Sequence, residues 1–135
     1  MKWSLQNKDR FPNFYDLVFA EHSYAGSDGV QAVMDFGPKD QFHISVVANN
    51  NNSNFGFYGN RESDTYEVMM EHYGKVIPLG ATSDVLAHQA PHNITRLMHN
   101  AWLNDYAWVT LCWQLRSEVD PDEVVPKEYK EVAHG

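Results

Sequence analysis

Hydrophobic and polar residues alternate along two neighbouring stretches in the first half of the chain. In residues 30–36 every second side chain is apolar, and the same holds for residues 41–47. The sequence Gly-Pro-Lys-Asp between them has the composition of a turn. Alternation with a period of two is typical of strands that bury one face. The pattern therefore predicts a β-hairpin over these residues.

Two further strands are expected after the asparagine-rich residues 49–54. Apolar residues again occupy every second position of TYEVMME, residues 65–71. A turn at residues 73–74 then leads into KVIPL, residues 75–79, in which Pro78 is compatible with a strand end or a sheet edge. The segments together predict an antiparallel meander of about four strands.

A helix is expected from Pro91, because proline is favoured in the first helical turn. Apolar residues then recur at helical spacing, at Ile94, Leu97, Met98, Ala101 and Trp102. The expected fold class is α+β: an antiparallel β-sheet of about four or five strands with one main helix packed on one face.

Two segments are ambiguous. Residues 106–115, YAWVTLCWQL, alternate as a strand would, and their aromatic and β-branched content favours a strand. A helical stripe also fits them, made of Trp108, Leu111, Cys112 and Leu115. Residues 11–22, FPNFYDLVFAEH, are compatible with either a short helix or a strand.

The chain of 135 residues is long enough for one domain with its own core. Its net charge of −8, with only ten lysines and arginines, argues against direct nucleic-acid binding, which depends on basic side chains. Residues 117–135 carry six acids against two lysines. We therefore expect a globular domain over residues 1–116, followed by an acidic C-terminal arm over residues 117–135.

The single cysteine, Cys112, excludes an intramolecular disulfide and a site built from several thiolates. The first residues lack the apolar segment of a secretion signal, and no stretch reaches the length of a membrane span. We expect a cytoplasmic protein with no membrane contact and no cofactor. The sequence leaves a homodimer open.

The most unusual segment is VANNNNSNFGFYGNRES, residues 47–63, where asparagines precede three aromatic residues set among glycines. The asparagines predict a soluble loop. Rigid rings beside an arginine and flexible polar residues are typical of protein interfaces. We therefore expect a contact loop whose binding residues are Asn50, Asn52, Phe55, Phe57, Tyr58 and Arg61. An equally weighted alternative is a strand over residues 55–58, with Phe57 packed inward.

The seven histidines form no convincing metal motif. His88 and His92 lie across a helix start, and His92 and His99 have no acid among their neighbours to complete a site. His43-Ile44-Ser45 is half of a two-histidine phosphoesterase pattern, but the second copy is missing. We expect no metal ligands and no catalytic residues.

A polar group of side chains is expected on the face of the sheet opposite the helix. Strand alternation places there Asp35, Gln41, His43, Ser45, Glu67 and Glu71. Such a mixture can perform acid–base chemistry. Half-exposed antiparallel sheets ordinarily carry similar residues, so a solvated face is the favoured interpretation.

Four short motifs follow one another between residues 41 and 103: ISVV, FYGN, TYEVMM and SDVLAHQAPHNITRLM. In this order they resemble small uncharacterised proteins encoded by tailed bacteriophages. The asparagine run and Ala90-Pro91-His92 depart from that pattern. The resemblance implies the cytoplasm of an infected bacterium as the setting, and it supplies no catalytic residues.

The leading functional hypothesis is a non-enzymatic, phage-encoded binding protein. It would inhibit or redirect a bacterial host or defence protein by steric contact, as anti-restriction and anti-CRISPR proteins do. One alternative is a small hydrolase, nucleotide-modifying enzyme or nucleotide-signal sponge that uses the polar sheet face around His43. The other is an acidic nucleic-acid mimic that presents Glu118, Asp120, Asp122 and Glu123.

Overall fold

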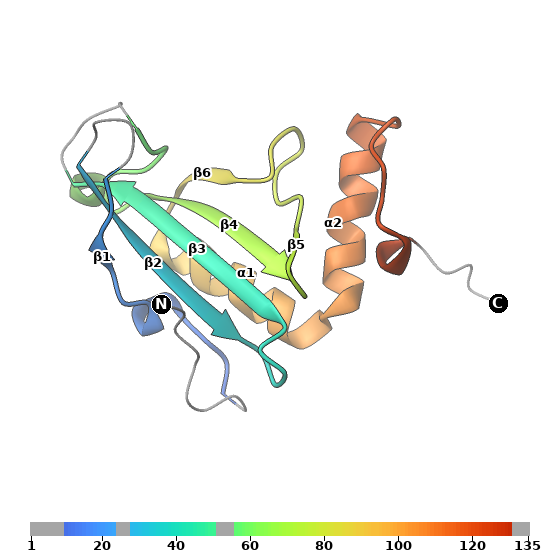
Figure 1. Cartoon of the computed structure of the whole chain (residues 1–135), viewed down its shortest axis with the longest axis horizontal. Helices are drawn as coiled ribbons and strands as arrows, with labels where there is room; N and C mark the ends of the chain where they lie inside the picture. The colour runs from blue at the N-terminus through green and yellow to red at the C-terminus, as the bar shows by residue number, and fades with distance from the viewer. Residues whose placement is uncertain (1–9, 24–27, 51–55, 131–135) are drawn as a thin grey trace.

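The computed structural model describes residues 10–23, 28–50 and 56–130. These residues form a six-stranded antiparallel sheet, two α-helices and three short 3-10 helices. The strand order is β1-β2-β3-β4-β5, and β6 also pairs with β4. In Figure 1 the sheet faces the viewer, α1 lies behind it and α2 stands to one side. The expected α+β fold class is confirmed.

The predicted hairpins are present in the sheet, but the strand expected over residues 75–79 is limited to Lys75–Val76. The strands are β1 (Ala20–Glu21), β2 (Gly29–Phe36), β3 (Phe42–Asn49), β4 (Tyr66–His72), β5 (Lys75–Val76) and β6 (Leu86–Gln89). β2 and β3 pair along their whole length, and the turn at residues 73–74 joins β4 to β5. The alternation of the sequence did not predict β6, in which His88 has a positive φ of 54° that interrupts the extended backbone.

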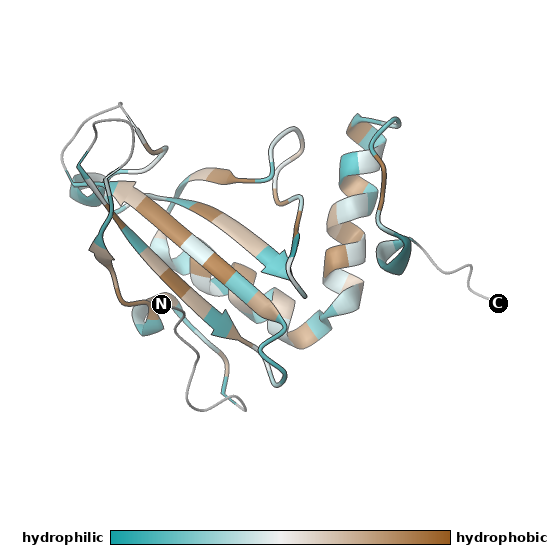
Figure 2. Cartoon of the chain, in the orientation of Figure 1, coloured by the Kyte–Doolittle hydropathy of each residue, from teal (hydrophilic) through white to brown (hydrophobic). Residues whose placement is uncertain are grey.

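The helix α1 (Pro91–Asn104) begins at the proline, as predicted, and covers one face of the sheet. Its Ile94, Met98 and Ala101 are completely buried. The strands contribute every second residue to the same core, including Met34, Phe36, Phe42, Ile44, Val46, Val68 and Met70. Figure 2 shows the contrast along β4, whose middle is hydrophobic while its final residues are hydrophilic.

Residues 106–119 form a second helix, α2 (Tyr106–Val119), so the strand favoured by their alternation is wrong. The helix buries Val109, Trp113 and Arg116, which recur at helical spacing on one face. Leu111 and Leu115 occupy another face and are exposed. Apolar residues on two faces of one helix therefore produced the alternation that resembled a strand.

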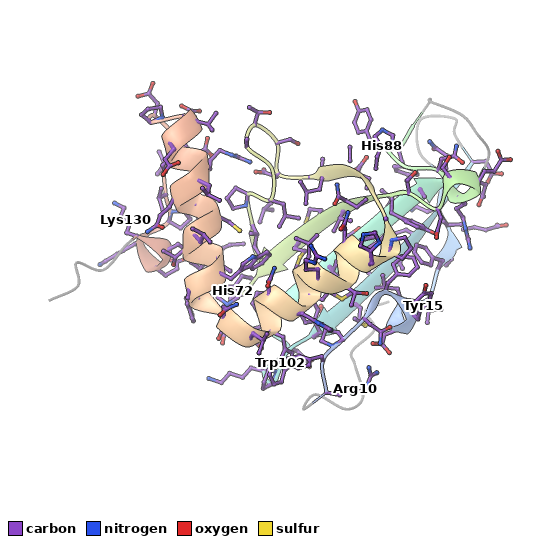
Figure 3. All side chains as sticks on the ribbon, turned by 180° about the vertical axis from the view of Figure 1, so that it is seen from behind. Arg10, Tyr15, His72, His88, Trp102 and Lys130 are labelled. Atoms are coloured by element: carbon purple, nitrogen blue, oxygen red, sulfur yellow. The ribbon has the colours of Figure 1, made fainter. Side chains whose placement is uncertain are left out.

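The C-terminal segment is attached to the sheet through the buried His72 at the end of β4 (Figure 3). Its Nδ1 lies 2.6 Å from the hydroxyl of Tyr129, in the 3-10 helix η3 (Lys127–Tyr129). Its Nε2 lies 2.8 Å from Oδ1 of Asp105, the residue between α1 and α2. Asp105 has a φ of 48°, which is rare for a residue other than glycine. The three side chains therefore hold the helix junction and the chain end against one strand.

We expect the stability of the fold to decrease as the pH falls below about 6.5, because His72 is buried in its neutral form. Burial lowers the pKa of His72, and the Asp105 carboxylate offsets this effect only in part. Between the lower folded pKa and the unfolded value of about 6.5, the unfolded chain binds more protons. Stability therefore rises with pH through this window and is fully present above it.

Urea unfolding between about pH 5 and 7.5 measures this dependence, and the window lies above the titration of ordinary carboxylates. NMR titration of the His72 ring assigns the effect to this residue. A ring pKa in the folded protein at or above about 6.5 would contradict the prediction.

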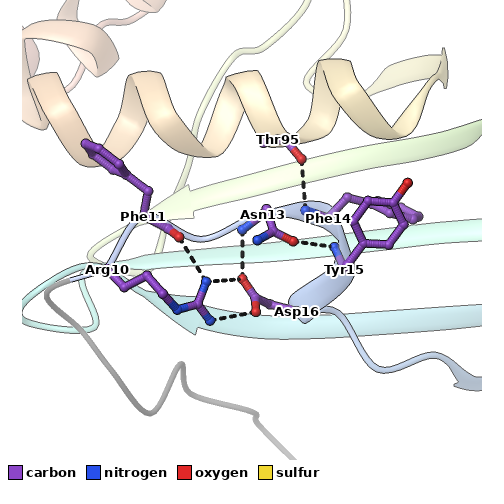
Figure 4. A network of polar contacts seen from close by, with 7 residues as sticks. All are labelled: Arg10, Phe11, Asn13, Phe14, Tyr15, Asp16 and Thr95. Atoms are coloured by element: carbon purple, nitrogen blue, oxygen red, sulfur yellow. Dashed lines mark hydrogen bonds and ion pairs between the residues drawn. The ribbon is translucent and has the colours of Figure 1, made fainter.

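The described N-terminal residues combine both forms that the sequence allowed, with a 3-10 helix η1 (Phe14–Asp16) followed by β1. Asn13 caps η1 by accepting a hydrogen bond from the Tyr15 N–H, and Asp16 accepts one from the Asn13 N–H. Arg10 donates to both carboxylate oxygens of Asp16 (Figure 4). The Phe14 N–H donates to the Thr95 hydroxyl, so this network fixes the segment on α1.

Candidate functional site

One face of the sheet is not covered by a described helix and faces the viewer in Figure 1. Residues paired directly across antiparallel strands share a face. The register of β2, β3 and β4 therefore builds a grid of nine side chains in three rows. The rows are Asp35-His43-Glu71, Val33-Ser45-Met69 and Gln31-Val47-Glu67. We call this grid the open face.

The first row of the open face contains an oriented histidine. Nδ1 of His43 lies 2.8 Å from Oδ1 of Asp35 across the hairpin, and Glu71 is the neighbour of His43 on β4. A carboxylate that fixes a histidine ring is a common arrangement in acid–base sites. Gln41 does not join this group, because it is buried in the turn before β3, where its Oε1 accepts from the Lys39 N–H. Its predicted place on the polar face is therefore wrong.

The opposite end of the open face has an aromatic rim. The Phe57 ring stacks on His22 with centroids 5.6 Å apart. It also lies over Gly29, where a Cβ would come within 2.6 Å of the ring. Glycine at this position therefore permits the ring to rest on the sheet. The Phe57 backbone is bound on both sides by Asn49, whose amide donates to the carbonyl at 2.8 Å and accepts from the N–H at 3.2 Å.

Tyr58 continues the rim and points its ring outward, with 60% of the residue exposed. Its N–H donates to Oε1 of Glu67 at 2.9 Å, and its carbonyl accepts from the His88 N–H at 2.8 Å. Gly59 then crosses the start of β4 so closely that a Cβ would lie 2.6 Å from Cα of Tyr66. Contacts to β3, β4 and β6 therefore hold the backbone of residues 57–59 on the sheet.

The rim and two rows of the open face enclose a hollow of about 520 Å³. Its walls are His22, Ser45, Val47, Gly56, Phe57, Tyr58, Glu67 and Met69. The aromatic loop and the polar sheet face, which the sequence treated as rival sites, thus meet in one concave surface. His43 and Asp35 do not line the hollow, because they belong to the far row.

The predicted binding residues are only partly brought together. Phe57 and Tyr58 lie in the rim, while Asn52 and Phe55 lie outside the described residues. Asn50 lies just beyond β3, and its amide donates to Oδ1 of Asp28. Arg61 instead lies 5.4 Å from the ring centre of Phe19. Phe19 packs on Tyr66, whose side chain belongs to the core, so Arg61 is outside the hollow.

Two predictions for the loop itself need correction. Asn49 is the last residue of β3 and is 99% buried, so the asparagine loop does not begin there. Its side-chain hydrogen bonds to the Phe57 backbone take the place of the hydrogen bonds to water that a loop asparagine would make. Residues 56–58 form bends rather than the alternative strand, although Phe57 does pack on the sheet.

Sequence patterns missed several residues of the hollow. His22 and Met69 carried no motif, and His22 reaches the site because β1 pairs with the start of β2. For Met69 a signal was available, since the alternation of residues 65–71 places it with Glu67 and Glu71 on the open face. No local pattern identifies His22, because its place in the hollow depends on the pairing of β1 with β2.

The side chains of the other candidate sites are not gathered into one place in the part of the chain that the structure describes. Within residues 10–23, 28–50 and 56–130, no three His, Cys, Asp or Glu side chains gather closely enough to hold a metal ion. None of the helices in these ranges is long and apolar enough to cross a bilayer. Of the four acids proposed for mimicry, Glu123 lies 3.9 Å from Arg116, and Asp120 accepts from the Asp122 N–H.

A second hollow, of about 670 Å³, lies between α2 and the C-terminal segment. Gln114, Glu118, Val124 and Lys130 contribute to its walls, and its single aromatic residue, Tyr129, is bonded to the buried His72. Carboxylates and a lysine share this hollow, so its charge indicates no particular ligand.

Comparisons of the chain with protein-family models, with curated protein sequences and with solved structures give no match.

Proposed function

We propose that this protein is a non-enzymatic binding protein that contacts another protein through its open face and aromatic rim. The observation that carries the proposal is the hollow, whose walls combine sheet residues with Phe57 and the outward-facing Tyr58. Aromatic side chains beside a recessed, partly apolar surface are enriched at the centres of protein interfaces. The partner would be blocked or redirected by steric contact.

The proposed setting is a bacterial cytoplasm during phage infection, and the proposed partner is a host or defence protein. The resemblance of residues 41–103 to small phage proteins supports this setting. The net charge of −8 supports a partner with a basic surface, since complementary charge accelerates association. An anti-restriction or anti-CRISPR role is one example of such activity.

A second function is favoured by one specific contact, the 2.8 Å hydrogen bond between Asp35 and His43. In this alternative the first row serves a small hydrolase or a nucleotide-modifying enzyme, with His43 as the acid or base. Catalytic groups ordinarily converge inside a pocket, whereas these two lie outside the hollow. Binding is therefore the better supported function. If the protein turned over a substrate and a folded His43→Ala variant did not, the enzyme would become the better supported function instead.

Tyr58→Ala is expected to weaken the capture of the partner at least about tenfold, because tyrosine is enriched among the residues that dominate binding at protein interfaces. The matched control is Tyr15→Ala, which removes another exposed tyrosine from η1, outside the hollow. Both backbone N–H groups keep their partners in these variants. The measurement is quantitative capture from bacterial lysate by each folded variant, followed by titration of the retained protein.

If wild type and Tyr58→Ala retained the partner equally while Tyr15→Ala lost it, the contact surface would lie outside the aromatic rim. Retention of no specific protein by the wild type would remove support for a binding protein.

A further inference from the structure

We infer that the hollow accepts an arginine side chain from a basic segment of the partner protein. This inference rests on the proposed function, because it names the chemistry that the open face recognises. Three features of the site carry it: the charge of the face, the position of one carboxylate, and the composition of the walls.

The charge of the open face has one sign. Its nine described positions include the carboxylates Asp35, Glu67 and Glu71, and they include neither lysine nor arginine. The chain around them is also acidic, with a net charge of −8. A cationic group approaching this face is attracted, whereas a phosphate meets carboxylates and finds no lysine or arginine on the grid, where His43 is already bonded to Asp35. The face therefore disfavours a nucleotide and favours a basic peptide.

Glu67 places a carboxylate in the wall of the hollow. Its Oε1 accepts the Tyr58 N–H at 2.9 Å, which fixes the side chain. No described residue forms a hydrogen bond with Oε2, so this oxygen remains available to a donor from outside the chain. A charge-assisted hydrogen bond from a guanidinium to such a preorganised carboxylate is among the stronger polar contacts in proteins.

The remaining walls match the other parts of an arginine side chain. A planar guanidinium stacks on aromatic rings, and the exposed Tyr58 provides one in the wall of the hollow. The chain already contains one such contact, where Arg61 lies over the Phe19 ring. Val47 and Met69 offer apolar surface for the methylene stem. Lysine could satisfy the charge but lacks the plane that stacks, so arginine is the better occupant.

The test begins with a displayed library of random short peptides, selected on the full-length wild-type protein. Clones that also bind the Tyr58→Ala variant are removed, so that the remaining peptides depend on the rim. The expected result is that these peptides share an arginine. A synthetic copy of one of them is then compared with its citrulline analogue, which keeps the shape of the side chain and removes the charge.

Citrulline is expected to reduce the affinity for the wild type at least about tenfold, because a charge-assisted contact is lost. Glu67→Gln should produce a similar loss for the arginine peptide and little further loss for the citrulline peptide. Glutamine retains an oxygen that can accept the Tyr58 N–H, so the rim is preserved. The matched control is Glu71→Gln, which removes the same charge from the open face but outside the hollow. It should lower the affinity for the arginine peptide less than about threefold.

Two outcomes would overturn the inference while leaving the proposed function in place. The first is a set of rim-dependent peptides without arginine. The second is an equal loss from Glu67→Gln and Glu71→Gln, which would indicate general attraction to an acidic surface. If no peptide depends on the rim, the proposed function fails and the inference fails with it.

Discussion

Tyr129→Ala is expected to lower the free energy of unfolding by about 4 kcal/mol, a cost typical of removing a buried aromatic ring. Tyr129 is 98% buried, and its ring packs on His72 and Tyr106 with centroids 5.5 and 6.0 Å away. Alanine would leave a cavity in this cluster and remove the hydroxyl bonded to His72. Urea denaturation measures the loss, and hydrogen exchange of residues 121–130 shows whether the segment detaches.

Tyr129→Phe removes only the hydroxyl and therefore measures its contribution apart from that of the ring. This variant should lower the free energy of unfolding by about 1 to 2 kcal/mol. With neutral His72, Nε2–H donates to Asp105 and the Tyr129 hydroxyl donates to Nδ1, so both ring nitrogens are bonded. Burial raises the pKa of Tyr129 to about 12, so the phenol keeps its proton at neutral pH. Phenylalanine leaves Nδ1 buried without this donor. Losses below about 1 kcal/mol in both variants would show that the segment does not stabilise the domain.

The sequence predicts the elements whose local pattern agrees with their tertiary environment. The hairpin of β2 and β3 has one buried and one open face, so burial alternates along most of β2 and through residues 42–46 of β3, whereas residues 46–49 are all buried. The helix α1 has a proline start and a single buried stripe. In α2 the local sequence pattern disagrees with the tertiary environment, because Leu111 and Leu115 are apolar yet exposed while Arg116 is polar yet buried. Residue pattern alone therefore assigns this helix to the wrong class.

The site is harder to predict, because it depends on contacts between distant segments. Composition identifies Phe57 and Tyr58 as unusual but gives no indication that they lie on the open face. Arg61 follows them closely in the chain, yet its guanidinium lies over Phe19, outside the hollow. Proximity in sequence thus groups residues that the fold separates. The reverse holds for His22, which β1 brings to Phe57 from a different part of the chain.

Asn49 and Asn50 provide the clearest test of how the rim is built. Asn49→Ala is expected to cost about 3 kcal/mol of folding free energy, because two partly buried backbone groups of Phe57 lose their partners. Asn50→Ala removes the same kind of side chain one position later. Its amide makes an exposed bond to Asp28, so the expected cost is below about 0.5 kcal/mol. Urea unfolding of the two variants measures the difference.

The Asn49→Ala and Asn50→Ala variants also test whether the stability of the rim affects partner binding. Because Asn49 holds the Phe57 backbone on the sheet, its loss should release the rim and weaken partner binding about as much as Tyr58→Ala. Asn50→Ala should leave binding unchanged. Amide signals of residues 56–59 report directly on the order of the rim in each variant. If Asn49→Ala keeps these signals and the wild-type affinity, the hydrogen bonds of Asn49 do not position the rim, and the backbone contacts of Tyr58 to Glu67 and His88 are sufficient.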